Sequence, residues 1–167
     1  ALGDARPALY AANYKALIND WRALFNNKNL PFGIMELSAG GEPQNLDNYE
    51  LRMLDPAPAI REGQFNAFRD LPHTGYAAAY DQQVNWYHPQ KKVELGERMA
   101  RWALSTQYGF NLGWEPAICT AIERLGDRII ITFNKAVKSS DDRPLEGFSI
   151  ALERNCLFLR QTQFSLS

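Results

Sequence analysis

The sequence predicts an α/β fold followed by a small antiparallel β module. Helical segments with one apolar face alternate with short apolar strands in the first two thirds of the chain, which is the rhythm of a parallel sheet. After about position 110 the pattern changes to β-branched runs separated by turn residues. We therefore expect an α/β segment over residues 1–109 and a β-strand module over residues 110–167.

Composition and charge limit the classes of function. The chain has 167 residues, of which 46% are hydrophobic and 22% are charged, a globular composition. A net charge of −1 gives no reason to expect nucleic acid as a partner. No run is long enough for a membrane span, and the first residues show no signal peptide. The missing initiator Met suggests a processed product or an excerpt.

Three helices and two strands are expected in the α/β segment. The first helix, residues 10–27, carries apolar residues at helical spacing with polar residues between them, and the buried strand 32–37 follows. After a long polar connection comes a helix at 59–69, a turn at 73–75 and a strand at 76–80. The apolar face of the first helix consists of Tyr14, Leu17, Ile18, Trp21, Leu24 and Phe25.

The third helix begins at Pro89 and ends near Tyr108, because proline is tolerated at the first helical position. Its expected buried face contains Leu95, Met99, Trp102 and Ala103. Two parallel strands with three helices do not make a stable sheet alone. The segment therefore reads as half of a larger sheet.

The β module is expected to contain strands at 118–124, 128–134, 145–152 and 156–159. Its two cysteines, Cys119 and Cys156, are predicted to be unpaired residues that face the module's core. They do not indicate a redox compartment.

The stretch from residue 74 to residue 89 carries the candidate chemistry. His88 lies in the loop after a strand and just before the expected third helix, where α/β folds assemble active sites. The helix dipole there would favour the neutral imidazole that accepts a proton. Asp81, Asn85 or the backbone carbonyl of Trp86 would orient the imidazole; alternatively, His88 only caps the helix or packs against Trp86.

The other parts of a hydrolytic site are missing from the sequence. No serine lies in a strand-to-helix elbow, and there is no phosphate-binding glycine loop and no cluster of metal ligands. We therefore expect neither a metal nor another cofactor, and on internal evidence the catalytic machinery is incomplete.

Four blocks of the sequence resemble the sialate O-acetylesterase family. The first block is Tyr-Lys-Ala-Leu-Ile-Asn-Asp-Trp-Arg at 14–22 with Leu-Pro-Phe at 30–32, and the second is Ile-Arg-Glu-Gly-Gln at 60–64. The third block runs from Thr74 to Asp81 and continues with His88-Pro89, Lys92 and Gly-Glu-Arg at 96–98. The fourth block is Gly-Asp-Arg-Ile-Ile-Ile-Thr-Phe at 126–133 with Leu-Glu-Gly-Phe at 145–148. The first two resemble the helix and strand after the family's Gln-Gly-Glu block and its Arg-Glu-Ala-Gln helix. The last two resemble its histidine block and its accessory β module.

The resemblance implies the C-terminal half of a flavodoxin-like SGNH hydrolase domain with a partial β module. It implies a serine esterase that removes O-acetyl groups from sialic acid or another sugar without a metal, with His88 as the catalytic base. The segment or chain with the serine nucleophile would be the partner, the isolated chain would be inactive, and the protein would be secreted, periplasmic or lysosomal. The family carries an aspartate two or three residues before its histidine, where this sequence has Asn85 and Trp86. The identity of the third triad member is therefore open, and Asp81 is either part of the site or structural.

A second interpretation is a non-catalytic carbohydrate-binding or interaction module. Aromatic side chains would then stack on sugar faces, with Trp86 and Tyr87 nearest the site. The full set is Tyr76, Tyr80, Trp86, Tyr87 and Trp114. Packing in the core is the ordinary role of such aromatics.

Overall fold

The computed structural model describes residues 7–38, 57–82, 92–137, 150–153 and 156–158. The described residues fall into two compact units, one before and one after the junction of Pro116 and Ala117. Each unit is considered by itself. No helix among the described residues has both the length and the apolar character to cross a membrane.

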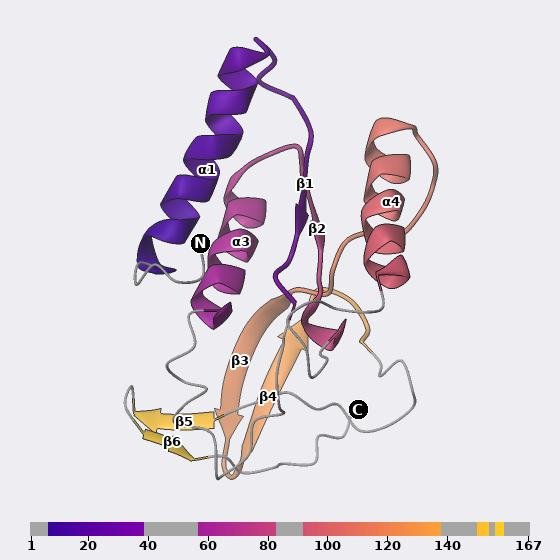
Figure 1. The fold of residues 1–167 in the computed structure, drawn as a ribbon. Coiled ribbons are helices and arrows are strands. Elements are labelled where there is room, and N and C mark those ends of the chain that lie inside the picture. Colours follow the sequence, from indigo (N-terminus) through magenta and orange to yellow (C-terminus); the bar gives the residue numbers. More distant parts are fainter. Residues whose placement is uncertain (1–6, 39–56, 83–91, 138–149, 154–155, 159–167) are drawn as a thin grey trace. The chain divides into compact units, whose positions relative to one another are not determined.

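The first unit is the predicted α/β fold. Its elements are α1 (Pro7–Leu24), β1 (Phe32–Met35), α3 (Ala57–Asp70), β2 (Thr74–Ala77), the short 3-10 helix η1 (Tyr80–Gln82) and α4 (Val93–Gln107). Strands β1 and β2 pair in parallel, with Phe32 opposite Thr74 and Met35 opposite Ala77. Helices α1 and α3 lie on one side of this strand pair and α4 lies on the other (Figure 1).

The two faces of the sheet are made by alternating residues. Ile34 and Tyr76 point toward α1 and α3 and form the core with Ile18 and Ala67. Their neighbours Gly33 and Gly75 are partners in the register and face α4. A methyl group on Gly75 would lie 2.2 to 2.4 Å from three atoms of the Trp102 indole. The helix therefore packs directly on the backbone of both strands, and Trp102 is buried there as predicted.

Arg22, which lies between the apolar positions of α1 in the sequence, is buried. Its guanidinium donates to the carbonyl of Leu30 at 3.1 Å and to the carbonyl of Pro72 at 2.7 Å. These carbonyls precede β1 and β2, so one side chain of α1 binds the chain at the entrance to both strands. The burial is tolerated because the charge has two hydrogen-bond partners.

The apolar face of α1 is wider than the core that it covers. Ile18 is fully buried, but Leu17, Trp21, Leu24 and Phe25 of the same expected apolar face are exposed. Helical periodicity identifies the apolar side of a helix, but it does not say whether the described part of the chain covers that side.

The boundaries of β2 and α4 differ from the sequence prediction in ways that bear on the candidate site. Strand β2 begins at Thr74, within the expected turn, and ends at Ala77, and η1 follows where the strand was expected to continue. Thr74 fits the strand because its hydroxyl donates to the carbonyls of Phe68 and Leu71. Helix α4 begins at Val93, five residues after His88 and not at Pro89.

The second unit contains antiparallel strands, as predicted. β3 (Cys119–Leu125) pairs with β4 (Arg128–Phe133) through a two-residue turn at Gly126-Asp127. Gly126 has φ +63°, the left-handed backbone that a type II′ hairpin requires at this position. β5 (Ile150–Glu153) pairs with β6 (Cys156–Phe158). β5 overlaps the end of the strand expected at 145–152.

The predicted environment of Cys119 is wrong. The thiol is free and exposed, and it does not face a core. The side chain of Cys156 lies outside what the structure describes.

Candidate active site at the carboxyl ends of the parallel strands

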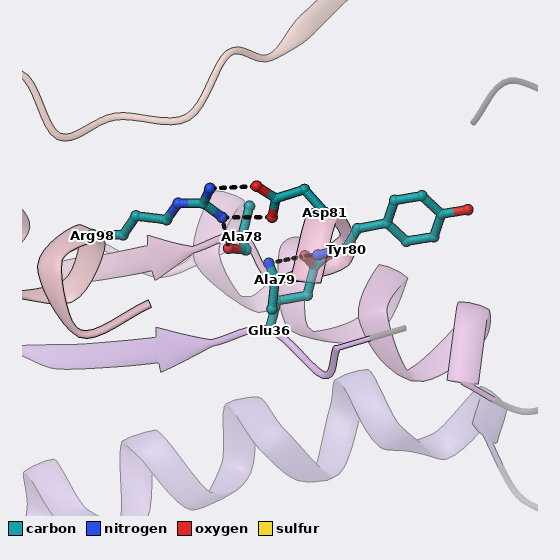
Figure 2. A network of polar contacts seen from close by, with 6 residues as sticks. All are labelled: Glu36, Ala78, Ala79, Tyr80, Asp81 and Arg98. Atoms are coloured by element: carbon teal, nitrogen blue, oxygen red, sulfur yellow. Dashed lines mark hydrogen bonds and ion pairs between the residues drawn. The ribbon is translucent and has the colours of Figure 1, made fainter. Parts of the chain in front are cut away.

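Glu36 organises the edge of the sheet where β1 and β2 end. It follows β1 directly, and its carboxylate accepts hydrogen bonds from the Tyr76 hydroxyl at 2.8 Å and from the N–H groups of Ala79 at 2.6 Å and Tyr80 at 3.1 Å. In Figure 2 the carboxylate lies beneath the turn formed by Ala79 and Tyr80. One side chain at the end of β1 therefore fixes the path of the chain as it leaves β2.

The same turn is held from the opposite side by Arg98 of α4. Its guanidinium donates to both carboxylate oxygens of Asp81, at 2.7 and 2.5 Å, and also to the carbonyl of Ala78 (Figure 2). Asp81 raises the pKa of Arg98 above its usual value, chiefly through this hydrogen bonding. Bidentate pairing fixes orientation as well as distance, so η1 is tied to α4.

Gln64 connects α3 to the end of β1. Its buried amide donates to the carbonyl of Met35 at 3.2 Å and accepts from the N–H of Leu37 at 2.8 Å. Arg61, one turn earlier on α3, lies with its guanidinium carbon 5.1 Å from the centroid of the Tyr80 ring. The Tyr80 ring points away from the Glu36 and Asp81 contacts (Figure 2) and is about half exposed. Gln64 thus braces the end of β1, and Arg61 contacts the turn beyond β2 through the Tyr80 ring.

The Tyr76 hydroxyl is a hydrogen-bond donor at every ordinary pH. Burial, followed by the nearby Glu36 carboxylate and its hydrogen bond, raises the pKa of Tyr76 far above the usual value of 10.0. Tyr76 is also part of the hydrophobic core, in edge and tilted contact with Phe65 and Phe68. Its ring is therefore a structural group, which removes it from the set of aromatics that could stack on a sugar.

The structure describes one of the predicted catalytic residues. Asp81 lies in η1, directly beyond β2, at the carboxyl edge where open α/β sheets bind ligands. His88, Asn85, Trp86 and Tyr87 lie outside the described residues, so their roles stay predictions. Because α4 begins at Val93, its first turn does not adjoin His88 in the sequence. The start of this helix therefore gives no reason to expect that its dipole favours the neutral imidazole of His88.

Glu36 and Arg98 are site residues that sequence reasoning missed. A lone carboxylate in the apolar stretch Phe-Gly-Ile-Met-Glu-Leu is the signal that could have identified Glu36, since a charge at the end of a buried strand needs partners. Arg98 belongs to a block that carries the family resemblance, but its spacing from Asp81 gave no sign of the pairing. Among the described residues there is no group of His, Cys, Asp and Glu side chains that could hold a metal ion.

Comparisons with known proteins show a likeness to a solved esterase structure. The chain is similar to the crystal structure of a carbohydrate acetylesterase from Xanthomonas citri, with a TM-score of 0.76 and 25% sequence identity. The match covers 93% of this chain and 35% of that chain. No protein-family model and no curated protein matches the sequence. This chain therefore has the fold of part of a carbohydrate esterase and spans about a third of its length.

Proposed function

We propose that this chain is the histidine-bearing part of a carbohydrate O-acetylesterase, a serine esterase whose nucleophile lies on a segment outside this chain. The observation that carries the proposal is the likeness to the Xanthomonas citri carbohydrate acetylesterase over 93% of the chain. Sialic acid is the sugar that the sequence resemblance favours, and other acetylated sugars are the alternative. On the same resemblance we propose a secreted, periplasmic or lysosomal setting.

The contacts at the carboxyl edge of the sheet support this role. Glu36 and Arg98 fix the turn at residues 78–81 from two sides, and this turn leads directly into the stretch with His88. A catalytic base must be held within a fraction of an ångström of its working position, and a fixed turn that precedes it in the sequence would serve that need.

In the proposed reaction His88 moves two protons. It takes the proton from the serine hydroxyl as the serine oxygen attacks the acetyl carbonyl, and gives it to the departing sugar oxygen. It then takes a proton from water, which attacks the acetyl-serine, and returns that proton to the serine oxygen as acetate leaves. The products are acetate and the free sugar hydroxyl, and no oxidant or metal is needed.

Groups close to His88 in the sequence would orient its imidazole ring. Asn85, through its side-chain oxygen, or Trp86, through its backbone carbonyl, would hold the imidazole N–H. Asp81 is a positioning residue, because Arg98 engages both of its carboxylate oxygens. Trp86 and Tyr87 would contact the sugar.

The test is hydrolysis of p-nitrophenyl acetate and of acetylated sialic acid by the complete polypeptide that contains this chain. His88→Ala should lower kcat/KM by roughly three orders of magnitude or more. Ser38→Ala is the matched control, since Ser38 follows β1 by three residues at the same edge of the sheet and should be dispensable. Loss of activity in Ser38→Ala with normal activity in His88→Ala would refute the assignment.

The carbohydrate-binding alternative predicts different results for binding and for hydrolysis. It predicts that acetylated glycans bind to the 167-residue chain alone, by calorimetry, without hydrolysis in any form of the protein. The exposed ring of Tyr80 would then be the first contact to test, through Tyr80→Ala. The esterase proposal predicts no turnover by the isolated chain and turnover by the complete polypeptide.

A further inference from the structure

The Arg61 guanidinium lies over the ring of Tyr80 at the carboxyl edge of the sheet. Its central carbon is 5.1 Å from the ring centroid. Arg61 belongs to the second turn of α3, and Gln64, one turn further along the helix, binds the end of β1. Burial and the Glu36 carboxylate raise the pKa of Tyr76, and the positive charge of Arg61 opposes them. The charge of Arg61 therefore acts at the same edge as the Glu36 contacts.

The two carboxylates of this edge are engaged by other groups. Arg98 donates to both oxygens of Asp81, and Glu36 accepts hydrogen bonds from the Tyr76 hydroxyl and from two backbone N–H groups. Neither carboxylate forms an ion pair with Arg61, because the ion pairs among the described residues are that of Arg98 and one at the far end of α3. The described part of the chain therefore gives the Arg61 guanidinium no carboxylate partner.

Contact with the Tyr80 ring leaves the hydrogen-bonding capacity of Arg61 in place. An aromatic ring provides no acceptor oxygen, whereas a guanidinium carries five N–H donors in a planar fork. The Arg61 side chain is partly buried, which reduces the screening of its charge by water. Its donors match the two oxygens of a carboxylate, which a guanidinium binds through parallel hydrogen bonds.

The Tyr80 ring supplies an apolar surface beside this cation. The ring is 49% exposed and points away from the Glu36 and Asp81 contacts (Figure 2). Its backbone N–H donates to Glu36 at 3.1 Å, so the fold itself fixes the position of this residue. An exposed aromatic ring that is held in this way can cover the C–H face of a sugar ring while its hydroxyl stays in water.

We infer that Arg61 and Tyr80 form a subsite for a sugar that carries a carboxylate group. The Arg61 guanidinium binds the carboxylate, and the exposed part of the Tyr80 ring packs against the sugar. This inference rests on the proposed function and deepens it, because it assigns the substrate of the esterase to the acidic sugars. The carboxylate takes no part in the proton transfers at His88; its binding orients the ester.

A contact of the same kind, away from the carboxyl edge, provides a matched control. Arg69 of α3 lies with its guanidinium carbon 5.9 Å from the ring centroid of Phe65, which packs on Tyr76 in the core. Arg69 is exposed in the last turn of the helix, more than two turns from Arg61. A substitution of Arg69 therefore removes a cation from the same helix and leaves the subsite intact.

The test compares two substrates that differ in the charge of one group, O-acetylated N-acetylneuraminic acid and its methyl ester. The complete polypeptide that contains this chain hydrolyses them, and the release of acetate is measured. The unaltered protein should have a kcat/KM about tenfold or more higher for the free acid, because the methyl ester cannot form a charge-assisted pair with Arg61. Arg61→Gln should bring the ratio of the two kcat/KM values to within about twofold of one, and Arg69→Gln should retain the ratio of the unaltered protein.

A merely structural role of Arg61 gives a different result. Loosening of the turn at Tyr80 would lower kcat/KM for both substrates to the same extent and leave their ratio unchanged, which would overturn the inference. An equal fall of the ratio in Arg69→Gln would overturn it as well. A ratio near one in the unaltered protein would also overturn it, and this measurement does not depend on the folding of a variant.

Binding distinguishes failure of the inference from failure of the proposed function. Calorimetry with N-acetylneuraminic acid, which carries no O-acetyl group, and with its methyl ester measures the subsite without turnover. Preferential binding of the acid that is lost in Arg61→Gln, without hydrolysis of either acetylated substrate, would keep the subsite and refute the esterase. Hydrolysis of both substrates without a preference for the acid would keep the esterase and refute the subsite.

Discussion

The hydroxyl of Tyr76 donates to the carboxylate of Glu36 at 2.8 Å, although 40 residues separate them in the sequence. Tyr76 belongs to β2 and Glu36 follows β1, so this contact joins the ends of the two parallel strands. The same carboxylate binds two backbone N–H groups of the turn beyond β2. The turn that leads toward His88 is therefore fixed by a partly buried charge with three donors.

Glu36→Gln should destabilise the first unit by about 1–3 kcal/mol, because an amide replaces a charged acceptor and brings an NH₂ group toward donors. Urea unfolding followed by circular dichroism measures the change. Glu97→Gln on α4 is the control and should change the free energy of unfolding by less than about 0.5 kcal/mol, since Glu97 is exposed. Equal effects of the two substitutions would contradict the role assigned to Glu36.

The stability of the first unit should fall as the pH rises above the usual tyrosine value of 10.0. The pKa of Tyr76 is higher in the folded state than in the unfolded chain. The contribution of its neutral hydroxyl to the free energy of unfolding is therefore fully present below pH 10.0, and it is lost above pH 10.0 because Tyr76 of the unfolded chain ionises first. One such group gives a slope of at most about 1.4 kcal/mol per pH unit. Tyr76→Phe should reduce this slope between pH 9 and pH 11, with the remainder coming from Tyr14, whose pKa is also raised by burial, whereas the exposed Tyr108→Phe should leave the slope unchanged.

Gly75→Ala should destabilise the protein by about 1–3 kcal/mol, because the new methyl group would overlap the Trp102 ring. Gly96→Ala is the opposite case, since it lies inside α4 with nothing within 4 Å of the added methyl group. That substitution should stabilise the helix by about 0.5–1 kcal/mol. Thermal unfolding of both variants checks the close packing of α4 on the sheet; a neutral Gly75→Ala would contradict it.

Arg98→Lys should loosen the turn beyond β2 while leaving the fold intact. A lysine cannot reproduce the paired bonds to Asp81 together with the bond to the Ala78 carbonyl. Both side chains of the pair are more than a third exposed, so the loss of stability should stay below about 1 kcal/mol. In the complete polypeptide kcat should fall more than KM changes, and Arg101→Lys should alter neither. Unchanged kcat in Arg98→Lys would separate this pair from the site.

Periodicity and composition predicted the parts of the fold in which each element's partners lie within the chain. The buried face of α4 was identified through Leu95 and Trp102, and the α/β segment followed by antiparallel strands was predicted correctly. On α1 the same reasoning identified an apolar face that includes Leu17 and Leu24, but both are exposed, because periodicity identifies the apolar side of a helix and not what covers it.

The misses in the first unit have a common cause. Arg22, Glu36 and Arg98 are charged residues whose partners are backbone groups or side chains distant in sequence, and a single sequence does not reveal such pairings. The beginning of β2 was missed because Thr74 and Gly75 read as turn residues. In the fold, the glycine is required for contact with Trp102 and the threonine hydroxyl binds carbonyls at the end of α3 and just beyond it.

The central claim is that His88 is the base of an ester hydrolase. The most direct measurement is kcat/KM for p-nitrophenyl acetate of the complete polypeptide with His88→Ala, beside the unaltered protein and the Ser38→Ala control. We expect a loss of roughly three orders of magnitude or more in His88→Ala and near-normal activity in the control. Turnover within about twofold of the unaltered protein in His88→Ala would contradict it.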